Sequence, residues 1–211
     1  MTEANAPVPA NRFELRRQRS RAALLDAAIE LFQEKGIRAT RLEEVCERAD
    51  VALRTFFNHF ETREHLYQAI GRQRAAQLAA LIDAQRDDPR AFAERLLELF
   101  ASIGGYVSAR PAYRELVGEM LHLRLEAGNE VIRSGSLGRA ALRFVADGVA
   151  RDEVTRRHRP EVLADLLLGA ITTALTNWSA SGDYDLSAGL EQAAQALLDL
   201  FAVSTAELQT P

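Results

Sequence analysis

The chain has 211 residues, of which 47% are hydrophobic and 27% charged, with a formal charge of −4 at pH 7. This composition is typical of a folded protein of one large or two small domains, and it excludes a chain that is disordered throughout. The one cysteine excludes an internal disulfide. The N-terminal segment lacks the apolar stretch of a secretory signal, and Asp165 interrupts the most apolar run, 163–178. We therefore expect a cytoplasmic protein without a membrane span.

The charge is unevenly distributed. Residues 11–21 carry one glutamate and five arginines, Arg12, Arg16, Arg17, Arg19 and Arg21, although the whole chain is acidic. A short basic segment on an acidic body indicates a local contact with phosphate, and the alternative is a solvated helix start.

Hydrophobic residues recur at helical spacing along the chain, and alternating β-type runs are missing from the sequence. The first predicted helix covers 12–35 and ends at Gly36, which supplies a left-handed residue. Thr40 and Glu43 form a capping-box pattern for a second, short helix that ends near Ala49.

A tight turn follows, in which Asp50 tolerates the left-handed conformation. A third short helix is predicted over 53–59, and Thr62 is the predicted N-cap of a fourth helix over 63–85. Three phenylalanines, Phe56, Phe57 and Phe60, are expected to fill the centre of this small domain. Two short helices joined by a tight turn and supported by a longer first helix predict a helix-turn-helix.

The remainder is an alanine- and leucine-rich helical pattern. Helices are predicted over about 92–103, 111–125, 140–149, 160–180 and 186–203, with the least regular stretch at 128–138. The fold class is therefore all-α, with about nine helices. We expect a flexible tail at 1–11, a three-helix helix-turn-helix domain at 12–66, a larger helical domain at 67–205 and a C-terminal tail at 206–211.

The stretch from Arg21 to Leu66 resembles the N-terminal DNA-binding domain of the TetR family of bacterial transcriptional repressors. The matching positions keep the family spacing and are Ala28 to Phe32, Gly36, Thr40, Val51, Thr55, Phe57, His59, Phe60, Thr62, Arg63, Glu64 and Leu66. The chain departs from the family pattern at Asp50, Ala52, Arg54, Phe57 and Arg63, where the family usually has Gly, Ser or Thr, Gly, Tyr and Lys. These departures affect individual contacts and leave the expected fold intact.

A helix-turn-helix places its second short helix in the major groove of DNA. Arg54 is suited to guanine and the Thr55 methyl group to thymine, whereas His59 is better placed for a phosphate. Thr40, Arg41 and Arg63 lie at helix N-termini, which attract phosphate, although Thr40 could serve only as a cap. The full predicted DNA-binding set is Arg17, Arg21, Thr40, Arg41, Leu53, Arg54, Thr55, Phe57, Asn58, His59 and Arg63.

The resemblance implies that the larger domain binds a small effector and dimerises through its last two helices. A dimer is also expected physically, because one helix-turn-helix offers too few base contacts for operator specificity. Aromatic and scattered polar residues suggest a pocket for an apolar or amphipathic effector. The candidate lining is Phe92, Phe100, Tyr106, Tyr113, Met120, His122, Asn177 and Trp178.

The expected function is a homodimeric repressor that binds a palindromic operator and is released by its effector. An activator or a ligand-independent regulator of the same fold, an all-helical enzyme and a protein-interaction adaptor are the alternatives. No catalytic motif or cofactor-binding motif occurs in the sequence. His122 with Glu119 and Glu126 is interpreted as a charge network and not as a metal site.

Overall fold

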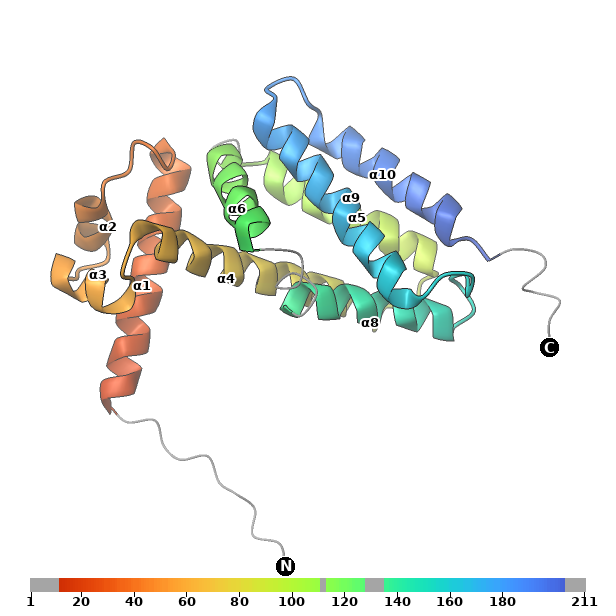
Figure 1. The fold of residues 1–211 in the computed structure, drawn as a ribbon, viewed down its shortest axis with the longest axis horizontal. Coiled ribbons are helices and arrows are strands. Elements are labelled where there is room, and N and C mark those ends of the chain that lie inside the picture. Colours follow the sequence, from red (N-terminus) through yellow and green to blue (C-terminus); the bar gives the residue numbers. More distant parts are fainter. Residues whose placement is uncertain (1–11, 111–112, 128–134, 204–211) are drawn as a thin grey trace, which may run out of the picture. The chain divides into compact units, whose positions relative to one another are not determined.

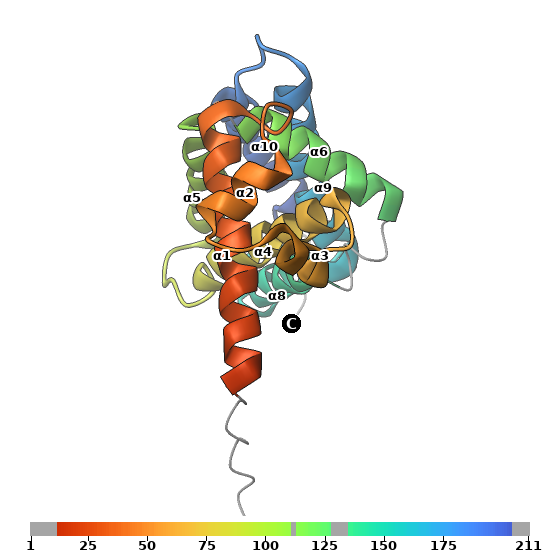
Figure 2. The same cartoon turned by 90° about the vertical axis from the view of Figure 1, so that its left-hand side faces the viewer.

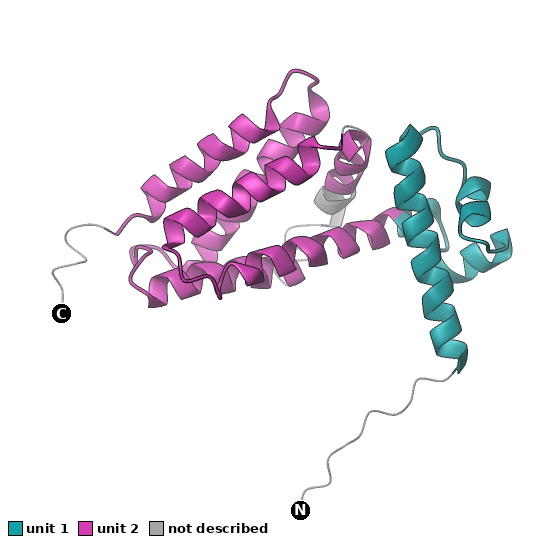
Figure 3. Ribbon diagram, turned by 180° about the vertical axis from the view of Figure 1, so that it is seen from behind, with its two compact units in different colours: residues 1–66 teal, residues 67–211 magenta. Residues whose placement is uncertain are grey.

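The computed structural model describes residues 12–110, 113–127 and 135–203. Within these residues the chain forms nine helices and no strand, which confirms the all-α prediction. The helices are α1 (Arg12–Lys35), α2 (Leu42–Arg48), α3 (Leu53–His59), α4 (Arg63–Ala84), α5 (Phe92–Ser108), α6 (Tyr113–Ala127), α8 (Ser136–Ala150), α9 (Pro160–Ala180) and α10 (Leu186–Phe201) (Figure 1). The chain divides into two compact units, the N-terminal unit (1–66) and the C-terminal unit (67–211) (Figure 3).

In the N-terminal unit, α2 and α3 pack against the C-terminal half of α1 (Figure 2). The first buried residue of α1 is Leu24, and the residues before it are exposed or half-buried. As predicted, α1 is followed by a left-handed glycine, Gly36, with φ of 83°. On the surface, the Arg48 guanidinium of α2 donates to Glu34 of α1 at 2.9 and 3.0 Å and lowers the pKa of that carboxyl.

The predicted capping box at Thr40 and Glu43 is wrong. The helix begins one residue later, with Arg41 as N-cap, and the Arg41 backbone N–H donates to the Glu44 carboxylate at 2.7 Å. The Thr40 side chain is buried, and its hydroxyl donates to the Gly36 carbonyl at 2.8 Å. The hydroxyl that the sequence pattern assigned to the cap of α2 therefore bonds instead to the carbonyl of Gly36, the residue after α1.

The turn between α2 and α3 follows the sequence prediction. Asp50 is left-handed, with φ of 52°, and Ala52 is the N-cap of α3 without a side-chain cap. Thr62 accepts the His65 backbone N–H at 3.3 Å, as expected of the N-cap of α4. Asp50 thus tolerates the conformation for which the family usually has glycine.

The C-terminal unit contains α4 from Tyr67 onward and helices α5, α6, α8, α9 and α10. In it α10 packs against α5 and α9, and both α8 and α6 pack against α9. Its core includes Phe92, Phe144 and Phe201, and the Phe92 and Phe144 rings stack at 4.8 Å. Gly148 permits this packing, because a Cβ atom there would lie 2.6 Å from Val154 and 2.7 Å from Phe92. Helix α8 begins at Ser136, four residues before its predicted start at Ala140, and residues 128–134 of the irregular stretch lie outside the described residues.

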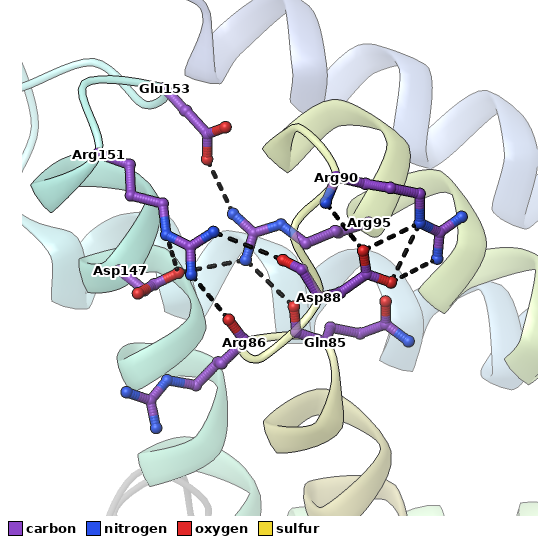
Figure 4. Close-up of polar contacts among 8 residues, drawn as sticks. All are labelled: Gln85, Arg86, Asp88, Arg90, Arg95, Asp147, Arg151 and Glu153. Carbon is purple, nitrogen blue, oxygen red and sulfur yellow. Dashed lines mark hydrogen bonds and ion pairs between the residues drawn. The ribbon is translucent and has the colours of Figure 1, made fainter.

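A fully buried arginine, Arg95 of α5, lies against both the Phe92 and the Phe144 ring, with its guanidinium carbon 5.8 and 5.5 Å from the two ring centroids. Its guanidinium donates to the Gln85 carbonyl at 3.1 Å, to Asp147 of α8 at 3.2 Å and to Glu153 at 2.8 Å (Figure 4). Arg151 also pairs with Asp147, at 3.1 Å, and donates to the Arg86 carbonyl at 2.8 Å. This network, the Arg95 cluster, joins the segment after α4 to α5, α8 and the turn after α8.

Helix α9 is long and apolar enough to cross a membrane, judged by length and composition alone. Seven of its residues, including Leu163, Leu167 and Trp178, are nevertheless buried within the C-terminal unit. This burial is typical of a core helix of a folded domain, and Asp165 lies on the exposed side.

Candidate nucleic-acid interface

Helix α3 has one buried side and one exposed side. Phe56 and Phe60 are buried in the N-terminal unit, and their rings lie 5.4 Å apart. Leu53, Arg54, Phe57 and Asn58 are exposed, and Thr55 is half-buried. The buried aromatic pair therefore holds a short helix whose other side offers a long cation, an amide and two apolar groups to a ligand.

Phe57 departs from the expected core. Its ring is 50% exposed and meets the edge of the Phe56 ring at a centroid distance of 5.4 Å. The prediction that all three phenylalanines fill the centre is thus right for Phe56 and Phe60 and wrong for Phe57. On a helix, position 57 lies about 100° around the axis from position 56, so the Phe57 ring is at the edge of the buried side.

Arginines of α1 lie on two sides of that helix. At about 3.6 residues per turn, Arg17 and Arg21 share the side of the buried Leu24 and Ala28, whereas Arg12, Arg16 and Arg19 share the opposite side. The Arg21 guanidinium lies over the Phe60 ring at 5.0 Å. In the described part of the chain, none of these five arginines forms an ion pair with a carboxylate.

His59, at the end of α3, is half-buried and lies close to Arg17 and Arg21. Burial lowers the pKa of its imidazole, and the positive charges of Arg17 and Arg21 lower it further. The imidazole is therefore held in its neutral form near neutral pH, a form that can still donate one hydrogen bond to a phosphate oxygen.

Thr40, Arg41 and Arg63, the three residues predicted at helix N-termini, differ in their exposure and in their hydrogen-bond partners. Arg41 is exposed. The hydroxyl of the buried Thr40 is turned inward, and the Arg63 guanidinium donates to the Ile37 carbonyl at 3.2 Å and to the Thr40 carbonyl. Arg63 thus binds the α1–α2 connection, a structural role that the sequence prediction did not include.

The eight predicted effector residues do not form one group. Phe92, Phe100, Tyr113 and Trp178 are buried, Met120 is half-buried, and Tyr106, His122 and Asn177 are exposed. Phe92 belongs to the core around the Arg95 cluster, whereas the Tyr106 and Tyr113 rings stack on each other at 6.2 Å. Trp178 lies under the Arg114 guanidinium at 4.7 Å. The side chain of Glu126, named in the metal alternative, lies outside the described residues.

Sequence reasoning missed Arg74, Arg95, Arg110 and Arg114, each of which lies over an aromatic ring of the C-terminal unit. A search for arginine three or four residues after an aromatic residue would have found Arg95, three residues after Phe92 in α5, and Arg110, which follows α5 four residues after Tyr106. The pairs of Arg74 with Tyr113 and of Arg114 with Trp178 join different helices and leave no such signal.

Helices α2 and α3, joined by a tight turn and packed on α1, form a helix-turn-helix within a chain whose described residues are all-α. Residues 24–70 match the family model described as bacterial regulatory proteins, tetR family. This match confirms, for the N-terminal domain, the resemblance to the TetR family that the sequence predicted.

A curated relative, the uncharacterised HTH-type transcriptional regulator YvkB of Bacillus subtilis, is 32% identical over 65 residues. The match spans 31% of this chain and about a third (34%) of that relative.

Solved structures share the fold over most of the chain. RolR in complex with resorcinol has a TM-score of 0.68 at 20% identity, covering 92% of each chain. FadR of Thermus thermophilus, a TetR-family repressor in complex with lauroyl-CoA, has a TM-score of 0.67 at 22% identity, covering 90% of this chain and 98% of that one.

Proposed function

We propose that this protein is a cytoplasmic, DNA-binding transcriptional repressor that binds a palindromic operator as a homodimer and releases it when a small effector binds the C-terminal unit. The observation that carries the proposal is the exposed side of α3. It offers Arg54 and Asn58, two side chains that read base edges, on a helix fixed from behind by Phe56 and Phe60.

The charges around α3 support this assignment. Arg17, Arg54 and Arg41 form no ion pair with a described carboxylate, so their charges are available to phosphate. Thr40 and Arg63 are used inside the N-terminal unit and drop out of the proposed contact set. The residues proposed to contact bases are Leu53, Arg54, Thr55, Phe57 and Asn58. Those proposed to contact the phosphates of the DNA backbone are Arg17, Arg21, Arg41 and His59.

Dimerisation through the last two helices is supported by apolar groups that the single chain leaves uncovered. Val162 and Leu166 of α9 are 39% and 43% exposed, one helical turn apart, and Leu200 of α10 is 43% exposed. Nothing lies within 4 Å of a Cβ built on Gly169, so a neighbouring helix could approach closely there. Two copies joined in this way would present two α3 helices to successive major grooves.

Release by a small effector is supported by the fold neighbours RolR and FadR, which were solved with resorcinol and lauroyl-CoA. Release requires that the effector bind more tightly to the DNA-free state than to the DNA-bound state.

The proposal is tested by binding purified protein to duplexes from the DNA flanking its own gene, across a range of salt concentrations. Arg54→Ala should weaken binding to the operator by about 1–3 kcal/mol and change binding to unrelated DNA much less, because one bidentate base contact is lost. Arg159→Ala, which removes an exposed arginine before α9, is the matched control and should leave affinity unchanged. Equal losses in both variants, or equal binding of the wild type to every duplex, would contradict the proposal.

A further inference from the structure

We infer that Arg74, Tyr106 and Tyr113 form an anion site in the C-terminal unit that takes the carboxylate of a small organic acid. The inference names the chemical class of the effector and rests on the proposed function only for the step from binding to DNA release. The three residues come from α4, α5 and α6 and are called the Arg74 site below.

Arg74 keeps hydrogen-bond donors that its contacts within the described chain do not use. Its Nη1 donates to the Gln77 amide oxygen at 2.7 Å and to the Tyr106 hydroxyl at 3.3 Å, and its Nη2 donates to the Tyr113 hydroxyl at 2.9 Å. All of these acceptors are neutral. A guanidinium has five N–H donors, so Nε–H and one N–H of the adjacent Nη2 are left over, and Nε is buried without a partner. Two neighbouring N–H groups are the pair that a carboxylate bridges with both oxygens.

The charges around Arg74 also favour an anion. No described carboxylate lies within ion-pair distance of Arg74. A second cation that pairs with no described carboxylate is close by, because the Arg110 guanidinium lies over the Tyr106 ring at 4.1 Å and donates to the Tyr106 carbonyl at 2.7 Å. Two arginines that share one aromatic group without an acid leave a local excess of positive charge, which a bound anion would neutralise.

The two tyrosine rings determine the shape of the Arg74 site. Tyr113 is buried, whereas Tyr106 is 43% exposed, so the site opens to solvent beside the Tyr106 ring. The two rings stack, with centroids 6.2 Å apart, and offer an apolar surface next to the cation. On the same side of α4, one turn earlier, Gly71 faces the Met120 side chain of α6, so the surroundings are apolar as well. This combination suits an acid with an apolar or aromatic body better than it suits inorganic phosphate.

The test is a titration of the full chain with benzoate, and with benzamide as the uncharged isostere, followed through the NMR signal of the Arg74 Nε–H group. Benzoate should shift this signal in a saturable way, whereas benzamide should not. Arg74→Gln should weaken benzoate binding, measured by calorimetry, about tenfold or more, because a charge-assisted hydrogen-bonded pair is lost. Arg72→Gln removes an exposed arginine from the same helix and should have no effect.

A second variant covers the case in which Arg74→Gln does not fold. Tyr106→Phe removes one hydroxyl from a partly exposed ring and should weaken benzoate binding several-fold. Equal binding of benzoate and benzamide, or equal affinity in the Arg74 and Arg72 variants, would overturn the site.

Operator affinity in the presence of benzoate is measured in a separate experiment. If benzoate binds at Arg74 and lowers operator affinity, both the site and the release step are supported. Binding without any change in operator affinity would refute the effector role while the site stands. Loss of operator binding in Arg54→Ala reports only on the DNA-binding proposal.

Discussion

The arginines of the N-terminal unit and the central arginine of the C-terminal unit differ in what neutralises them. Arg17 and Arg54 are exposed and have no carboxylate partner among the described residues, whereas Arg95 is fully buried between two carboxylates and a carbonyl. A buried charge must be paired because desolvation is costly, but an exposed charge costs little to leave open. Pairing thus separates arginines that hold the fold from arginines that are free to bind an external anion, and Arg74 belongs with the second group.

The largest expected effect is on Arg95. Arg95→Met removes the cation that Asp147 and Glu153 share, and breaking a buried pair in this way should lower the free energy of unfolding by about 3–5 kcal/mol. Urea unfolding followed by the fluorescence of Trp178, the one tryptophan of the chain, reports on the C-terminal unit. Arg143→Met is the control, because its pair with Asp83 is about two-fifths exposed and should be worth less than about 1 kcal/mol. Similar losses in the two variants would remove the distinction between buried and exposed arginines.

A smaller effect is expected from single arginines of α1. Arg17→Gln should reduce the slope of log affinity for DNA against log salt concentration by about 0.9, the value for one phosphate contact. Arg19→Gln makes the same charge change two residues away, on the opposite side of the helix, and should leave the slope nearly unchanged. Equal changes would mean that the arginines act through their combined field and not through contacts.

The smallest effect is expected at His59. Because its pKa is lowered in the folded protein, the unfolded chain takes up a proton first as the pH falls below about 6.5. Stability should therefore decrease from about pH 6.5 down to the folded-state pKa, and His59→Gln should lose less stability over that range.

The same histidine tests the position of Arg17. In an NMR titration, Arg17→Gln should raise the pKa of His59, since one of its two cationic neighbours is removed. Arg19→Gln should leave that pKa unchanged. A His59 pKa that does not respond to Arg17 would place the arginine away from α3.

Local patterns in the N-terminal unit were sufficient for most of its fold. The left-handed residues Gly36 and Asp50, the Thr62 cap and the burial of Phe56 and Phe60 are all as predicted. Each depends on residues within a few positions of one another, and for this reason the sequence pattern indicates them directly. The capping box failed because the Thr40 hydroxyl donates to the carbonyl of Gly36, the residue that follows α1, and does not cap α2.

In the C-terminal unit the sequence predicted helices but not which faces meet. The eight candidate effector residues were chosen for their type, and the structure divides them between the core and separate surface clusters. Arg74 joins Tyr106 and Tyr113 across 32 and 39 residues. Helical periodicity identifies a buried face, but it does not identify the partner of that face.

The sequence by itself determined the helical class, the helix-turn-helix and the family resemblance of the N-terminal domain, because these depend on short-range spacing of side chains. Only the tertiary structure decided which arginines are paired, which aromatic rings are buried and where Arg74 meets its tyrosines. Those properties depend on contacts between helices that are distant in the chain, and their energies are set by burial and by the local arrangement of charge.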